Sequence, residues 1–116
     1  MPPPSPLAIC TGSVQRLLKE EASYHAELAE QEAQVKLLEA EVASGGQASD
    51  DGNADFMLKQ QRTAVEQTKA VFGPLKKRLD EAVAALEDQV AASEETGTHA
   101  ADLEQAKSTL QKAKAA

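Results

Sequence analysis

The sequence has little of what a compact globular core needs. Only 3% of its 116 residues are aromatic, it has no tryptophan, and the aromatic side chains are Tyr24, Phe56 and Phe72. No stretch alternates apolar and polar residues with a period of two, so the pattern predicts no β-strand. Alanine, glutamate, glutamine, lysine and leucine dominate, a composition typical of long helices and coiled coils. We therefore expect an all-α protein.

Three further shortages exclude whole classes of protein. The single cysteine, Cys10, permits no internal disulfide and suits a reducing compartment. The sequence lacks the basic start and apolar run of a secretory signal, and it lacks the roughly 20 apolar residues of a membrane span. We therefore expect a cytoplasmic protein. Its net charge of −7 disfavours nucleic acid and anionic membranes as partners.

Motifs for catalysis, metals and cofactors are missing as well. His25 and His99 have no cysteine or carboxylate partner at a metal-ligand spacing. Cys10 has no base placed beside it by spacing, and no Gly-rich phosphate loop occurs. We expect no enzyme, no metal and no cofactor.

Apolar residues recur every seven positions through two long segments, residues 7–43 and 55–92. A period of 3.5 sustained over about five heptads predicts long helices packed like a coiled coil. Polar residues at some of these positions either fix the helix register or mark places where the bundle is open. In residues 7–43 the two series of seam positions are Leu7, Val14, Glu21, Leu28, Val35 and Val42, and Cys10, Leu17, Tyr24, Gln31 and Leu38. In residues 55–92 they are Leu58, Val65, Phe72, Leu79 and Leu86, and Gln61, Thr68, Leu75, Ala82 and Gln89.

The first helix follows a Pro-rich leader, residues 1–6. Ser5 and Pro6 suit an N-cap followed by the first helical position. Gly12 weakens the helix by about 1 kcal/mol relative to alanine. Thr11 is therefore an alternative N-cap.

Two turn-rich segments separate the helices. Residues 44–53 predict the first loop, with Asp51 or Asn53 as a cap for the second helix, and residues 93–98 predict the second loop. A shorter third helix is expected over residues 99–114. Its apolar face consists of Leu103, Ala106, Leu110 and Ala113.

Gly73 and Pro74 fall in the middle of the second helix. Proline removes a backbone donor and clashes with the preceding turn, so we expect a bend there. The apolar seam continues in phase across Pro74, which favours one bent helix over two separate ones. The expected fold is an up-down-up, coiled-coil-like three-helix bundle, with residues 7–116 forming a single domain.

Three stretches of sequence resemble the tubulin-binding cofactor A family. The first is Ile9-x-Thr11-Gly12-x-Val14-x-Arg16-Leu17-x-Lys19-Glu20, followed by Tyr24, Glu27 and Gln31-Glu32. The second is Pro74 with Arg78-Leu79-x-Glu81-Ala82, and the third is Leu103-x-x-Ala106-Lys107. The resemblance covers about residues 7–114. The chain departs from the family in its Pro-rich leader, in Cys10 where a lysine is expected, and in an Ala-rich third helix.

The resemblance implies a three-helix protein, monomer or homodimer, whose middle helix is bent by proline. It implies a chaperone-like cofactor, associated with the cytoskeleton, that captures β-tubulin after its release from the cytosolic chaperonin. Such a cofactor stores β-tubulin or passes it toward assembly of the αβ-tubulin heterodimer. Other tubulin-folding cofactors are further candidate partners, and the resemblance implies no nucleotide and no metal.

Two functional hypotheses stay open. In the first, helix surfaces capture β-tubulin, and the candidate partner-binding residues are Arg16, Lys19, Tyr24, Lys76, Lys77 and Arg78. Each has a plainer interpretation, because Tyr24 occupies a seam position and the basic run is able to pair with nearby acids on its own helix or the first helix. In the second hypothesis, the chain is a structural coiled-coil module that associates with itself or with other helical partners.

Overall fold

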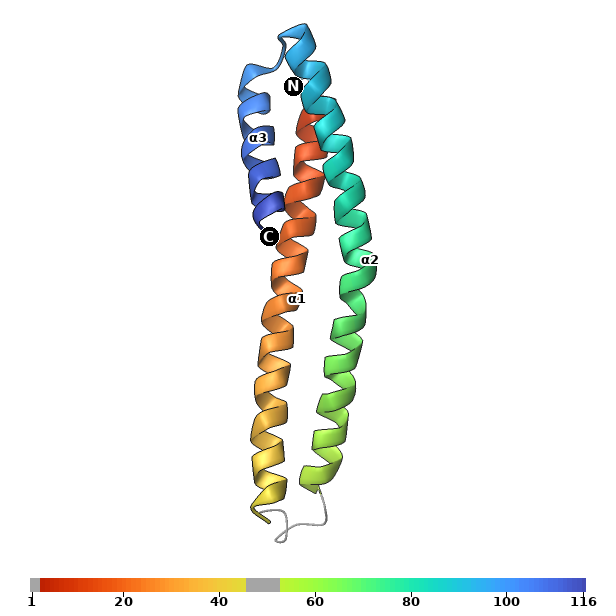
Figure 1. The fold of residues 1–116 in the computed structure, drawn as a ribbon, viewed down its shortest axis with the longest axis vertical. Helices are drawn as coiled ribbons and strands as arrows, with labels where there is room; N and C mark the ends of the chain where they lie inside the picture. The colour runs from red at the N-terminus through yellow and green to blue at the C-terminus, as the bar shows by residue number, and fades with distance from the viewer. Residues whose placement is uncertain (1–2, 46–52) are drawn as a thin grey trace. The chain divides into compact units, whose positions relative to one another are not determined.

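The computed structural model describes residues 3–45 and 53–116, which form three helices and, within those ranges, no strand (Figure 1). α1 spans Pro6–Ala43, α2 spans Asn53–Thr96 and α3 spans Ala100–Ala115. The expected all-α fold is confirmed. Most of the first predicted loop, including the candidate cap Asp51, lies outside the described residues. Asn53 is the first residue of α2.

α1 begins where the sequence favours a helix start. The Ser5 Oγ accepts a hydrogen bond of 3.1 Å from the Ala8 N–H, which satisfies one of the donors left unpaired at a helix N-terminus. Pro6 is the first helical residue, a position where a missing N–H removes no helical bond. The alternative start at Thr11 is wrong. Thr11 lies inside the helix, and its Oγ1 donates to the Leu7 carbonyl at 2.8 Å.

α2 runs through Pro74 as one helix, as the unbroken seam predicts. Proline has no N–H, so the Ala70 carbonyl lacks its usual partner four residues later. The ring of a proline also crowds the Cβ of the residue before it, which disfavours helix there. Gly73 has no Cβ, and this lets the helix pass the proline with one lost hydrogen bond.

The predicted end of α2 at residue 92 is wrong, because the helix continues to Thr96. Ser93 is buried, and the Thr96 Oγ1 lies 3.2 and 3.3 Å from the carbonyls of Ala92 and Ser93. The Thr96 hydroxyl is therefore accommodated within the helix. Gly97 then adopts φ 68°, and the Thr98 N–H donates to the Ser93 carbonyl at 3.2 Å. This arrangement is a Schellman-type helix end, which favours glycine.

α3 starts one residue later than predicted, after His99. His99 has φ 59° and ψ 47°, in the left-handed region, and its side chain makes no capping bond. The His99 carbonyl accepts the first helical hydrogen bond, 2.8 Å from the Leu103 nitrogen. Two left-handed positions, Gly97 and His99, separated by Thr98, reverse the chain in a three-residue connection.

The chain divides into two compact units, each of which is described by itself. Unit 1 consists of Met1–Glu21 and Gly73–Ala116, and unit 2 consists of Ala22–Phe72. α1 and α2 contribute to both units, whereas α3 belongs to unit 1 alone.

All three helices contribute side chains to the core of unit 1. Its buried cluster contains Leu7 and Val14 from α1, and Cys10 packs half-buried against it. Lys107 pairs with Glu94 at 2.8 Å and Lys114 pairs with Glu87 at 3.6 Å, so these parts of α2 and α3 run in opposite directions. The remaining cluster members are Leu79, Leu86, Val90, Ala106 and Leu110, with Leu103 and Ala113 packed at its edge as predicted.

In its described residues, unit 2 is built from Ala22–Ala43 of α1 and Asn53–Phe72 of α2. Leu38, Leu58 and Val65 are its large buried aliphatic side chains. Arg62 pairs with Glu39 at 2.8 Å on the outside of the seam. Across both units, all the seam positions named from the sequence are buried or half-buried. The heptad pattern therefore identified the packing faces of both long helices.

Candidate partner-binding surface

The basic run after Pro74 is exposed on α2 in unit 1. Lys76 Nζ lies 3.2 Å from Asp80 Oδ1, one helical turn further along. Arg78 Nη2 lies 3.3 Å from Glu20 Oε1 and so reaches across to α1. Lys77 has no ion pair among the described residues. The plainer pairing expected for this run is thus present for two of its three cations.

The two basic candidates on α1 both lie within one turn before Glu20, the residue that makes that contact. Lys19 is exposed and directly precedes Glu20, the acid that Arg78 contacts. Arg16 is exposed, and its Nη2 donates to the Ser13 Oγ at 3.3 Å. The structure therefore brings Arg78 onto the α1 segment that carries Lys19, and this segment of unit 1 holds cations from both helices.

A surface hollow of unit 1 adjoins the same region. It is lined by Lys76 and Asp80 from α2, by Lys114 near the end of α3, and by Leu79 and Val83. Apolar and charged groups therefore adjoin there, a combination found at protein interfaces.

Tyr24 belongs to unit 2, whereas the five basic candidates belong to unit 1. Its ring meets Phe72 edge-on, with ring centres 6.4 Å apart and planes at 79°. The His25 ring also contacts Phe72. It stacks on the Phe72 ring, with ring centres 4.4 Å apart. Tyr24 is half-buried, as its seam position predicts. An edge-to-face pair of this kind stabilises a helix contact by about 0.5–1.5 kcal/mol beyond its area.

One pKa in unit 1 departs from its ordinary value. A hydrogen bond to Glu94, with the attraction of that carboxylate, raises the pKa of Lys107 above 10.5. This solvent-exposed pair links α3 to the last turn of α2. No group of three or more His, Cys, Asp or Glu able to hold a metal occurs in residues 3–45 and 53–116. In the same ranges no helix has the length and hydropathy to cross a membrane.

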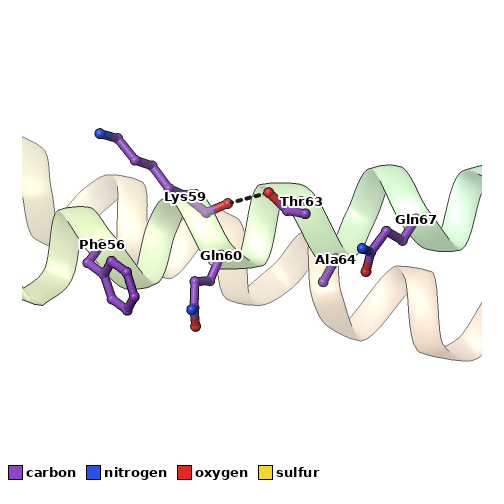
Figure 2. Close-up of a pocket in the computed structure, with 6 residues that line it drawn as sticks. All are labelled: Phe56, Lys59, Gln60, Thr63, Ala64 and Gln67. Carbon is purple, nitrogen blue, oxygen red and sulfur yellow. Dashed lines mark hydrogen bonds between the residues drawn. The ribbon is translucent and has the colours of Figure 1, made fainter.

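Exposed apolar side chains were not singled out by the sequence reasoning. Ile9 is exposed in unit 1, and Leu37, Phe56 and Met57 are exposed in unit 2. Phe56 opens a shallow groove along α2 whose lining also includes Gln60 and Gln67 (Figure 2). The exposure of Phe56 could have been predicted from the sequence, because Phe56 does not fall on the heptad seam.

These features describe a class of protein built from long amphipathic helices that offers surfaces to another polypeptide. A family model for tubulin binding cofactor A matches residues 2–110. The crystal structure of tubulin folding cofactor A from Arabidopsis thaliana is similar, with a TM-score of 0.73 and 27% sequence identity. That match covers 95% of this chain and 94% of the Arabidopsis chain. No curated protein sequence matches the chain.

The chain belongs to the tubulin binding cofactor A family, because the family model spans nearly all of it. The resemblance inferred from the sequence is confirmed.

Proposed function

We propose that this protein is a tubulin-folding cofactor. It captures and stabilises β-tubulin intermediates after their release from the chaperonin, and it supports assembly of the αβ-tubulin heterodimer. The observation that carries the proposal is the family match over residues 2–110. The proposal includes a cytoplasmic, cytoskeleton-associated location, other tubulin-folding cofactors as further partners, and no catalysis by the chain.

The proposed architecture is one three-helix domain over residues 7–116, in up-down-up order with a bend at Pro74. The opposite directions of α2 and α3 within unit 1 support this order. The missing N–H of the proline supports the bend. Such an arrangement gives the client long helical faces to lie against.

Exposed cations of unit 1 supply a physical route for capture. Lys19 and Lys77 have no ion pair among the described residues, so their charge is available to an acidic client surface. The pairs made by Lys76 and Arg78 are solvent-exposed. Exposed pairs contribute only about 0–1 kcal/mol, so a client carboxylate replaces the internal partner at little cost. Complementary charge of this kind mainly raises the association rate and specificity.

Co-purification with β-tubulin tests the proposal. Wild-type protein is expected to retain β-tubulin, and Lys76→Glu/Lys77→Glu/Arg78→Glu is expected to lose most of it. A control with the same charge change, Lys36→Glu/Lys69→Glu/Lys112→Glu, is expected to retain it. If wild-type protein retains no β-tubulin, the proposed function is contradicted. If the first triple variant binds like wild type, the basic cluster plays no part in capture.

The structural coiled-coil role is the second candidate, and the exposed apolar side chains of unit 2 favour it. It predicts a stable higher oligomer that does not retain β-tubulin. Light scattering over a range of chain concentrations distinguishes it from the cofactor role.

A further inference from the structure

One serine of the chain is followed directly by proline, and the structure places this pair where α1 begins. Ser5 and Pro6 form the only Ser-Pro or Thr-Pro pair in the sequence. Pro3, Pro4 and Pro6 are exposed, and Ser5 is half-buried. Pro3–Ser5 lie outside regular secondary structure. The residues on both sides of the serine are therefore at the surface of unit 1.

A proline directly after a serine is the feature by which proline-directed protein kinases choose their acceptor. Proline has no N–H. A kinase pocket that offers no hydrogen-bond acceptor at that position takes proline without loss, whereas any other residue buries an unpaired donor there. Such a kinase therefore has one acceptor in this chain, the Ser5 hydroxyl.

The hydroxyl is held in the folded protein by two hydrogen bonds. Ser5 Oγ accepts from the Ala8 N–H at 3.1 Å and donates to Asp102 Oδ2 at 2.9 Å. Helix ends open far more readily than the whole fold, and Gly12 further weakens the start of α1. An opening that frees Ser5 and Pro6 leaves the buried Leu7 in the core. Local fraying therefore presents the hydroxyl to an enzyme without unfolding unit 1.

We propose that Ser5 is the acceptor site of a proline-directed protein kinase, and that phosphate on its hydroxyl loosens the start of α3. The Ser5 oxygen attacks the γ-phosphorus of ATP, the bond from that phosphorus to the β,γ-bridging oxygen breaks, and ADP leaves. The hydroxyl proton passes to the catalytic carboxylate of the kinase. The inference does not rest on tubulin capture and uses none of the residues proposed for it.

Phosphate at Ser5 turns an attractive contact between α1 and α3 into a repulsive one. The ester oxygen has no hydrogen to donate, so the bond to Asp102 is lost. A phosphoserine carries about −1.5 to −2 charges at pH 7, and these come to lie beside the Asp102 carboxylate. The N-terminus of α1 attracts the phosphate, whereas the corresponding place on α3 is already taken by Asp102. α1 therefore keeps its start, and the first turn of α3 is pushed away.

The charges around Ser5 offer the phosphate no compensating partner. Along α1 the first lysine or arginine after Ser5 is Arg16, about three turns further on. The first on α3 is Lys107, which is paired with Glu94 at 2.8 Å. Residues 79–96 of α2 carry six carboxylates and no lysine or arginine. The three helices therefore supply negative rather than positive charge to this part of unit 1.

Phosphate transfer to the folded, full-length chain tests the acceptor site. Wild-type protein incubated with ATP and a proline-directed kinase is expected to take up a single phosphate, which mass spectrometry of its peptides places on Ser5. Ser5→Ala removes the acceptor, and Pro6→Ala keeps the hydroxyl but removes the recognised ring, so neither is expected to be modified. Ser13→Ala is the control and is expected to behave like wild type. An unmodified wild type, or a Pro6→Ala chain modified as fast as wild type, overturns the proposal.

Amide hydrogen exchange before and after phosphorylation tests the effect on α3. Phosphorylation is expected to speed exchange over Leu103–Leu110 by about fivefold or more and to leave Leu58–Phe72 of unit 2 unchanged. Asp102→Asn removes the repelling charge and supplies an amide donor, so the acceleration in that variant is expected to stay within about twofold. Circular dichroism checks that every variant is folded. Unchanged exchange of α3, or equal acceleration in wild type and Asp102→Asn, overturns the proposal.

Discussion

The Ser5 hydroxyl joins the start of α1 to the first turn of α3. Its Oγ donates to Asp102 Oδ2 at 2.9 Å while accepting from the Ala8 N–H at 3.1 Å. The Asp102 carboxylate lies in the first turn of α3, where the helix dipole stabilises negative charge. Further along the same two helices, Gln15 Nε2 donates to Thr109 Oγ1 at 3.2 Å. One small polar side chain therefore serves two helix N-termini and their mutual packing.

Replacing Ser5 by alanine removes the cap and the bond to Asp102 together. We expect the free energy of unfolding to fall by about 1 kcal/mol, within about 0.5–2 kcal/mol. Urea unfolding followed by circular dichroism measures the change. Ser13→Ala is the control, because the Ser13 Oγ accepts only an exposed bond from Arg16. Equal effects of the two variants would contradict the capping role of Ser5.

Replacing Gly97 or Gly12 by alanine is expected to change the stability of the protein in opposite directions. Gly97 adopts φ 68°, so a Cβ there costs about 1–2 kcal/mol, and Gly97→Ala is expected to destabilise the protein by about that amount. Gly12 lies inside α1, where an added Cβ meets only the end of the Arg16 side chain at 3.7 Å. Gly12→Ala is expected to stabilise by about 0.5–1 kcal/mol. Thermal unfolding of both variants checks the signs, and a gain at position 97 would contradict the account of the α2 end.

The sequence was sufficient to predict the packing faces, because burial of two long helices against each other is periodic. Leu86 and Leu75 are fully buried, and Glu21 is half-buried, as their heptad positions require. The polar seam positions are explained only in part. The Gln31 Nε2 donates to Glu27 at 3.4 Å, whereas its Oε1 is buried without a partner among the described residues. A periodic pattern identifies such a position but does not identify the partner of its polar atoms.

Helix ends were harder to predict, because they depend on a few local hydrogen bonds. The run from Ser93 to Thr96 has the composition of a turn, yet the Thr96 hydroxyl lies near carbonyls of the same helix. The actual signal was Gly97, since only a left-handed residue there closes the helix end. The prediction of Thr11 as an N-cap failed for a similar reason. Threonine is favoured at N-caps, but inside a helix its hydroxyl can instead donate to the carbonyl four residues earlier, as Thr11 does to Leu7.

The candidate site was predictable in kind but not in detail. The basic residues Lys76, Lys77 and Arg78 are exposed as expected, but the sequence could not select Glu20 as the partner of Arg78. That choice depends on which turns of α1 and α2 lie opposite each other. The heptad pattern marks only the buried seam, whereas Phe56 lies exposed on another side of α2.

Among the substitutions considered, one in the core of unit 1 is expected to lower the stability most. Leu86 is fully buried in the cluster shared by all three helices. Leu86→Ala removes its contacts and leaves a cavity, so we expect a loss of about 2–5 kcal/mol. Leu37 is 63% exposed, and Leu37→Ala is expected to stay within about 0.5 kcal/mol of wild type. Similar losses at the two positions, measured by urea unfolding, would contradict this placement of the core.

The pair between Lys107 and Glu94 predicts a pH dependence. Its hydrogen bond and charge attraction raise the pKa of Lys107 in the folded protein above the ordinary 10.5. The folded state therefore holds this proton more tightly than the unfolded state, and the resulting stability is present below pH 10.5. It is lost as the pH rises through the folded pKa. At pH 8 Lys107→Gln is expected to have a lower unfolding midpoint than wild type, and this difference should shrink as the pH rises above the ordinary 10.5. A difference that stays constant with pH would show that the pair does not stabilise the fold.

The contact between Glu20 and Arg78 permits a test that separates stability from capture. As an exposed pair it contributes about 0–1 kcal/mol, so Glu20→Gln and Arg78→Gln should each lower the free energy of unfolding slightly. Their effects on β-tubulin retention should differ in sign. Glu20→Gln frees the guanidinium for an acidic client and is expected to raise retention, whereas Arg78→Gln removes the cation and is expected to lower it. Retention by immobilised protein, measured beside urea unfolding, gives both quantities. If both variants lower retention in proportion to their loss of stability, Arg78 acts only as a structural link between α1 and α2.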